Sequence, residues 1–199
     1  MPIETEIKIR LSEVTEFRSR LGLLSPVLLS ERHFEDNFVL DYPDGRLRSH
    51  SCLLRVRKTK GKESVTFKGP PLPSRLFKRR EELESQVDDA DIMLQIFEQI
   101  GLRVWFRYQK YREEYQLAVA GGPAGKLQLA LDSTPIGNYA ELEGPEEGIR
   151  TVAAALGFPE SQFLRDSYYS LFAQYCGERG LDTGHMVFAP GDESGSAPR

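Results

Sequence analysis

The opening residues predict a strand with four consecutive charged side chains on one face. Residues 3–10 alternate strictly between apolar or β-branched side chains and charged ones. Successive side chains of a strand point to opposite faces, so one face is apolar and the other carries Glu4, Glu6, Lys8 and Arg10. Such a face must either lie in water or line an interior in which the charges are neutralised.

The same alternation returns in five later segments. Their charged side chains share one parity within each segment: Arg55 and Arg57, Thr66 with Lys68, Arg80 with Glu82 and Glu84, Lys110 and Arg112, and Glu141 and Glu143, while Asp132 ends the run 127–131. These strands could form an open sheet with a wet charged face, or a barrel with the charges inside. A charged lumen is stable only if the charges pair, coordinate metals or hold an anionic ligand. Both signs on the first strand point to a ligand that is anionic and metal-bound.

Eight short motifs in a fixed order show a resemblance to a known family. They are Glu-x-Glu-x-Lys at residues 4–8, then 54–57, 66–70, 80–84, 110–112, 131–132, 136–144 and 167–169. The chain resembles the CYTH superfamily, the triphosphate tunnel metalloenzymes, over about residues 1–176. This family includes class IV adenylyl cyclases, thiamine triphosphatases and inorganic triphosphatases, and the chain is most similar to its CyaB-like branch.

The pattern and the resemblance together predict an α+β fold. We expect a closed antiparallel barrel of about eight strands, forming a tunnel with a charged lumen, with helices packed outside. Expected helices span about 12–24, 89–100, 145–156 and 160–175, and a turn is expected at 121–125. We expect residues 1–176 to form the tunnel domain. Residues 177–199 are rich in Gly, Asp, Glu, Ser and Pro, so we expect a disordered C-terminal tail.

The lumen offers cations for phosphate and carboxylates for a metal. Arginine presents a planar fork to phosphate oxygens and lysine a compact charge. The expected substrate-binding cations are Lys8, Arg55, Arg57, Lys68, Arg80, Lys110, Arg112 and Arg165. Carboxylates would repel such a substrate unless they hold Mg²⁺ or Mn²⁺. The resemblance implies metal ligands at Glu4, Glu6, Glu141 and Glu143, followed by Asp132 and Glu82, and catalytic roles for Glu4, Glu6, Lys8 and Lys68.

Three functions compete. Attack of water on the terminal phosphoryl group gives triphosphate hydrolysis, which we favour. Attack of a ribose 3′-hydroxyl on the α-phosphoryl group gives ATP cyclisation. The third is a non-catalytic polyphosphate- or nucleotide-binding module, which the retained carboxylates disfavour.

Class IV cyclases tend to carry a His-Phe element before the Glu-x-Glu-x-Lys motif, and only three residues precede it here. Family triphosphatases often have tyrosine where this chain has Val39, two residues before Asp41.

Composition limits the partners. The net charge of −4 argues against nucleic acid, and no apolar run approaches the roughly 20 residues of a membrane span. No signal peptide is expected, because charged residues occupy the region of its apolar stretch. Cys52 and Cys176 suggest thiols in a reducing compartment, so we expect a cytoplasmic protein. The expected partner is a triphosphate-containing small molecule, and exposed barrel flanks leave a homodimer open.

One aromatic run permits two interpretations. Trp105, Phe106 and Tyr108 lie close together in the segment 102–117, which is expected to form a long strand. They could stack on a base. We favour packing under a helix, because aromatic side chains dominate protein cores.

Overall fold

The structure, a computed structural model, describes residues 3–118 and 127–191. Within these ranges the chain forms eight strands and five α-helices. The strands are β1 (Ile3–Leu11), β2 (Val27–Asp41), β3 (Leu53–Lys58), β4 (Ser64–Lys68), β5 (Lys78–Gln86), β6 (Arg103–Leu117), β7 (Leu127–Thr134) and β8 (Gly137–Glu143). The helices are α1 (Val14–Gly22), α2 (Arg46–Ser49), α3 (Ala90–Gln99), α4 (Glu146–Ala155) and α5 (Tyr168–Arg179). The predicted turn at 121–125 and the last eight residues, 192–199, lie outside the described ranges.

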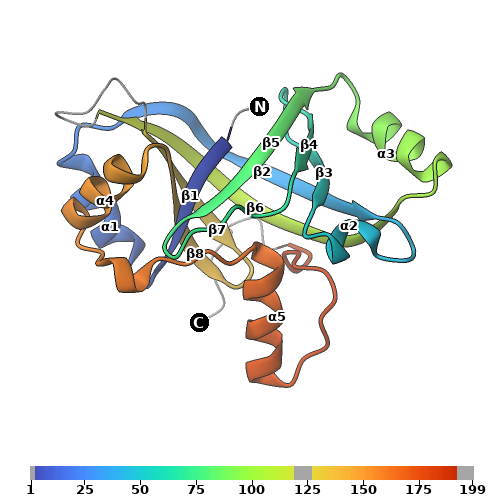
Figure 1. The fold of residues 1–199 in the computed structure, drawn as a ribbon. Coiled ribbons are helices and arrows are strands. Elements are labelled where there is room, and N and C mark those ends of the chain that lie inside the picture. The colour runs from blue at the N-terminus through green and yellow to red at the C-terminus, as the bar shows by residue number, and fades with distance from the viewer. Residues whose placement is uncertain (1–2, 119–126, 192–199) are drawn as a thin grey trace.

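The strands close into a barrel. Their order is β1-β5-β4-β3-β2-β6-β7-β8, and β8 pairs with β1 to complete the ring. Every neighbouring pair of these strands is antiparallel. The predicted α+β fold with a closed antiparallel barrel is therefore confirmed (Figure 1).

Helices cover the apolar outside of the barrel. At one end, α1 and α4 pack on the outward faces of β1, β7 and β8, where Ile7, Ile9, Leu129 and Leu142 are fully buried. At the opposite end, α3 covers Leu40 and Val56 (Figure 1). Because the apolar residues lie outside, the opposite parity of each strand faces the lumen.

Three helix details differ from the sequence prediction. The sequence predicts Ser12 as the cap of the first helix, but the residue that precedes α1 is Glu13, and its side chain makes no capping hydrogen bond. In α3 the helical spacing predicts a buried face of Ile92, Ile96, Phe97 and Ile100. Phe97 does pack on the barrel, with Ala90 and Leu94, but residues 92, 96 and 100 are about half exposed. Both sets have helical spacing, so the sequence pattern alone did not choose between them.

The last helix begins at Tyr168, eight residues later than predicted. A short 3₁₀ turn covers Glu160–Gln162, and the chain then extends so that Leu164 pairs with Lys8 through two backbone hydrogen bonds. Ser167 caps α5 by accepting a hydrogen bond from the Ser170 N–H at 3.1 Å. This cap and the pairing with β1 replace the first turns of the expected helix.

The disordered tail predicted from residue 177 is not what the structure shows up to residue 191. Helix α5 continues to Arg179, and Met186 pairs with β6 in parallel orientation. Its N–H donates to the Arg107 carbonyl at 3.0 Å, and its carbonyl accepts from the Gln109 N–H at 2.8 Å. β7 pairs with β6 only from Tyr111 onward, so this stretch of β6 offers its edge to residue 186. Met186 is a single buried apolar residue in this segment, so no apolar periodicity is visible in the sequence. The polar composition of the segment therefore predicted disorder.

Deleting residues 180–199 should therefore lower stability. The deletion removes the fully buried Met186 side chain and two strand-like hydrogen bonds. We expect a loss of about 2–4 kcal/mol, or roughly 5–10 °C in Tm. Thermal unfolding of the truncated chain and of Met186→Ala measures this. An unchanged Tm in both proteins would show that the segment does not contribute to the fold.

Candidate active site

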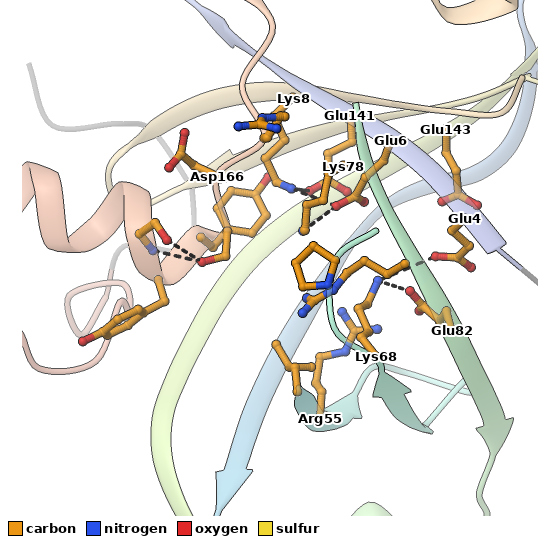
Figure 2. A pocket seen from close by; sticks show the side chains of 18 of the residues that line it. Glu4, Glu6, Lys8, Arg55, Lys68, Lys78, Glu82, Glu141, Glu143 and Asp166 are labelled. Carbon is orange, nitrogen blue, oxygen red and sulfur yellow. Dashed lines mark hydrogen bonds and ion pairs between the residues drawn. The ribbon is translucent and has the colours of Figure 1, made fainter. Parts of the chain in front are cut away.

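The lumen holds one large charged cavity of about 970 Å³. Side chains from all eight strands and the start of α5 line it. Every predicted site residue except Asp132 is among the lining residues. Figure 2 shows the labelled lysines and glutamates converging on this space. The alternation seen in the sequence thus corresponds to the inward faces of the strands, and the cavity is large enough for a small organic ligand.

Asp132 lies just behind the cavity and anchors cations. Its carboxylate accepts hydrogen bonds from Lys110 Nζ at 2.9 Å, from two Arg112 nitrogens at 2.7 Å each, and from the Tyr168 hydroxyl at 2.6 Å. The residue is fully buried. A buried carboxylate with this many donors is a fixed counter-ion, so the geometry favours an anchoring role over the predicted metal ligation.

Glu35 is a second anchor, which the sequence analysis missed. It is 1% exposed and contacts Arg57 Nη1 at 3.0 Å and Lys110 Nζ at 3.5 Å. Burial would raise the pKa of Glu35, but the charges of Arg57 and Lys110 outweigh it and hold this pKa well below its usual value. The two anchors therefore fix Arg57, Lys110 and Arg112 as a preorganised cationic wall.

The same wall continues through Glu141 to Lys8. Glu141 contacts Arg112 Nη2 at 2.5 Å and Lys8 Nζ at 3.3 Å. Although burial opposes it, the Lys8 and Arg112 charges keep the pKa of Glu141 well below its usual value. The pKa of Lys8 is raised for the reciprocal reason, because Glu141 and Glu6 outweigh its burial. Both groups are therefore charged at neutral pH.

A cluster of carboxylates adjoins the Lys8 end of this wall, on the neighbouring strands β8, β1 and β5. Figure 2 shows Glu4, Glu82 and Glu143 gathered together on one side. Burial, a hydrogen bond with Glu82 and the charge of Glu143 raise the pKa of Glu4 to about 9. Burial and the charges of Glu6 and other carboxylates raise the pKa of Glu143 to about 7. The one ammonium group at this cluster, among the described contacts, is Lys68, which pairs with Glu82 and lies 3.7 Å from Glu4.

Lys78 joins the cluster through Glu6 and was also missed from the sequence. Its Nζ donates to Glu6 Oε1 at 2.6 Å. Burial and the neighbouring Lys8 and Lys68 charges lower the pKa of Lys78 to about 8, although Glu6 opposes this. The pKa of Glu6 itself is held well below its usual value, because the charges of Lys78 and Lys8 outweigh burial. Lys78 has the same parity on β5 as Arg80 and Glu82, so extending the alternation by two residues would have found it.

The carboxylate cluster fits a divalent cation in chemistry. Its donors are hard oxygens, the ligands that Mg²⁺ and Mn²⁺ prefer. Burial is the largest cause of the raised pKa values of Glu4 and Glu143, and neighbouring carboxylates add to it; a bound cation would offset both. Over the described residues, no three His, Cys, Asp or Glu side chains are already arranged to enclose a metal ion. In this arrangement Lys68 pairs with Glu82, and Lys78 pairs with Glu6.

The remaining predicted cations lie around this core. Arg55 donates to Thr66 at 2.9 Å and to the Tyr108 hydroxyl at 3.3 Å. Arg80 donates to the backbone carbonyls of Gly69 and Ser51, and Arg165 to that of Ser74. Carbonyl partners leave the positive charges of Arg80 and Arg165 without a bound carboxylate in these contacts. Both side chains line the cavity and can face an anionic ligand.

The shifted pKa of Glu143 makes a pH-dependent prediction. A carboxyl group whose pKa rises from 4.5 to about 7 on folding stabilises the protein fully below about pH 4.5 and loses this contribution as pH rises through about 7. Glutamine does not titrate, so Glu143→Gln lacks this loss. The difference in Tm, variant minus wild type, should therefore rise between pH 5 and pH 8 by the equivalent of about 2 kcal/mol of unfolding free energy. Thermal unfolding of both proteins in EDTA across this range tests it. A constant Tm difference would contradict the raised pKa.

Fold and site together define an antiparallel barrel whose one charged cavity contains a cationic wall and an adjoining carboxylate cluster. The sequence profile of the CYTH domain matches residues 2–157. The chain belongs to the CYTH family, which confirms the resemblance seen in its motifs.

Relatives and solved structures agree with this assignment. A Methanocaldococcus jannaschii protein named "Putative adenylate cyclase" is 26% identical over 174 residues, 85% of this chain and 98% of the relative. A Vibrio parahaemolyticus structure described as a "putative adenylate cyclase" has a TM-score of 0.74 at 17% identity, covering 86% of this chain and 98% of that one. A Hippeastrum structure described as a "putative adenylyl cyclase" with a dominant triphosphatase activity has a TM-score of 0.59 at 20% identity, covering 86% and 96%. The described helices include none long and apolar enough to cross a membrane.

Proposed function

We propose that this protein is a divalent-metal-dependent phosphohydrolase that acts on triphosphate-containing substrates. One observation carries the proposal. A single cavity contains both a preorganised cationic wall and a cluster of carboxylates that are buried close together. A linear polyanion could lie along the wall while its far side shares a metal with the cluster. A purely anion-binding protein would gain from losing these carboxylates.

The cations divide into two kinds. Arg57, Lys110, Arg112 and Lys8 are held in place by buried carboxylates, so little reorganisation is needed when phosphate oxygens arrive. Arg55, Arg80, Lys68 and Arg165 have weaker or exchangeable partners and can turn toward the ligand. Together they would neutralise the charge that develops on the phosphoryl oxygens and the leaving group.

A metal ion would be held by Glu4, Glu6 and Glu143, with Glu82 and Glu141 beside them. Triphosphate tunnel enzymes of this family are generally dependent on a divalent metal, which supports this assignment. When bound, the ion supplies polarisation of the phosphoryl oxygens and lowers the pKa of a coordinated water. The protein's own contribution is to exchange partners: Lys68 leaves Glu82, Lys78 leaves Glu6, and both ammonium groups turn toward phosphate oxygens.

Hydrolysis is the first candidate reaction and cyclisation the second. The triphosphatase activity described for the Hippeastrum protein supports the first, and the cyclase name of the M. jannaschii relative supports the second. A panel of inorganic triphosphate, ATP and thiamine triphosphate, each with Mg²⁺ and Mn²⁺, decides between them. We expect orthophosphate as the main product. Cyclic AMP and pyrophosphate as the main products from ATP would overturn the hydrolase proposal.

We also propose a cytoplasmic location and a small-molecule partner. Cys52 and Cys176 are both free thiols, in agreement with a reducing compartment.

A further inference from the structure

A β-bulge turns an extra aromatic side chain toward the cavity. In the pairing of β2 with β6, Val39 opposes Phe106 whereas Leu40 opposes Val104, so Trp105 is the additional residue. Val104 packs outside with Leu40, and both Trp105 and Phe106 line the cavity. A regular strand would place Trp105 and Phe106 on opposite faces. Bulges beside active sites commonly redirect a side chain in this way.

The redirected tryptophan belongs to an aromatic end of the lumen. We define this aromatic end as Trp105, Phe106 and Tyr169, with Arg48 above them. The Trp105 and Tyr169 ring centroids are 4.6 Å apart, and those of Phe106 and Tyr169 are 5.1 Å apart. The Arg48 guanidinium lies over the Trp105 ring, 4.6 Å from its centroid. Tyr169 meets both rings edge-on, at 70° and 76°, and Arg48 covers one face of Trp105. Nucleobases stack on aromatic rings and on guanidinium planes, so a base could stack on the Arg48 guanidinium or on a ring face that borders the cavity.

The aromatic end is continuous with the cationic wall. Phe106 stacks on Tyr108, with their centroids 5.8 Å apart and the rings 21° from parallel. The Tyr108 hydroxyl accepts a hydrogen bond from Arg55 on β3, one of the cations proposed to bind phosphate. The side chains of the aromatic end, together with Tyr108 and Arg55, all line the same cavity. A group attached to phosphates on Arg55 would therefore meet the aromatic end next.

Packing of α5 accounts for only part of these contacts. Phe106 is 1% exposed and serves as core, but Tyr169 is 38% exposed and Trp105 is partly exposed. Both border the cavity rather than an enclosed core. Inorganic triphosphate has no apolar part that would use such a wall, whereas the rest of the lumen is lined mainly by charged groups.

We infer that the aromatic end is a subsite for the planar heteroaromatic part of an organic triphosphate, of the nucleoside triphosphate class. This inference rests on the proposed function, because it places the phosphates on the cationic wall. It further specifies the substrate: an organic triphosphate should be preferred over inorganic triphosphate, and the preference should depend on Trp105.

Trp105 is the single tryptophan of the chain, so its fluorescence reports directly on the subsite. We expect ATP to quench this fluorescence in EDTA, with saturation, and inorganic triphosphate to displace ATP without quenching. Binding of ATP that leaves the Trp105 fluorescence unchanged would overturn the inference. This measurement uses the wild-type chain and so does not depend on whether a variant folds.

Kinetics of matched variants provide the second test. Stacking on a base implies that Trp105→Leu should lower the ratio of kcat/KM for ATP to that for inorganic triphosphate by about tenfold to a hundredfold, whereas Trp105→Phe should largely keep it. An unchanged ratio in Trp105→Leu would overturn the subsite. The proposed function fails separately: quenching by ATP without hydrolysis of any triphosphate would refute the phosphohydrolase and leave the subsite standing.

Discussion

Replacing Glu4 or Glu6 with glutamine should reduce triphosphate turnover by about 100- to 1,000-fold while leaving the barrel folded. Each change removes a negatively charged oxygen ligand from the proposed metal site, and an amide binds a divalent ion less strongly. The two variants should differ in stability. The raised pKa of Glu4, about 9, leaves this carboxyl group mostly protonated at neutral pH, so the neutral amide of Glu4→Gln should be about as stable as the wild type. Glu6→Gln loses its pairing with Lys78 and should be less stable.

Steady-state kinetics with inorganic triphosphate, together with thermal unfolding, measure both effects. Glu81→Gln is the matched control, since Glu81 neighbours Glu82 on β5 but has the outward parity. Its kinetics should match those of the wild type. Turnover that survives in both Glu4→Gln and Glu6→Gln would mean that neither carboxylate takes part in the reaction.

The second large effect concerns the two sides of one hairpin, Arg57 on β3 and Lys68 on β4. Removing a charge-assisted phosphate contact costs about 1.5–3 kcal/mol, so alanine at either position should weaken triphosphate binding about ten- to a hundredfold. The two alanine variants should differ in folding free energy. Arg57→Ala leaves the buried Glu35 with fewer cations and should cost roughly 3 kcal/mol of folding free energy. Lys68→Ala takes the ammonium partner from Glu82, but Glu82 keeps its hydrogen bond with Glu4, so this variant should cost less.

Calorimetric titration with inorganic triphosphate and denaturant unfolding give the two quantities for each variant. Orthophosphate serves as the reference ligand, because it reaches fewer of the cations and its affinity should change less. If both variants lose stability while triphosphate affinity in the folded protein stays the same, these residues are structural ion-pair partners and the cationic wall does not bind phosphate.

The lumen was predictable because strand parity is a local property. The alternation around Glu4, Arg55, Lys68 and Glu141 assigned the inward side chains without knowledge of the partners. Lys78 follows the same parity and was simply not included. Glu35 was hidden, because β2 carries polar residues on both faces at the end where its pairing with β6 shifts register. Its strand therefore shows no clean alternation.

The contacts that give each charge its role could not be read from the sequence. From the sequence, Asp132 could be a metal ligand. In the fold, β6 and α5 place Lys110, Arg112 and Tyr168 within hydrogen-bond distance of its carboxylate. The direction of Trp105 depends on a one-residue bulge, and the burial of Met186 on an edge of β6 left uncovered by β7. Each depends on pairing between segments far apart in the chain, which local patterns do not encode.

The most direct test follows orthophosphate release from inorganic triphosphate by the full-length protein. The reaction is run with excess Mg²⁺ or Mn²⁺, then with excess EDTA, then with the metal restored. We predict steady release with metal, none in EDTA, and recovery on restoration, with Glu6→Gln slower than the wild type by about 100-fold or more whenever metal is present. Undiminished release in EDTA, or no release by folded protein with either metal, would contradict the proposal that the charged lumen is a metal-dependent triphosphatase site.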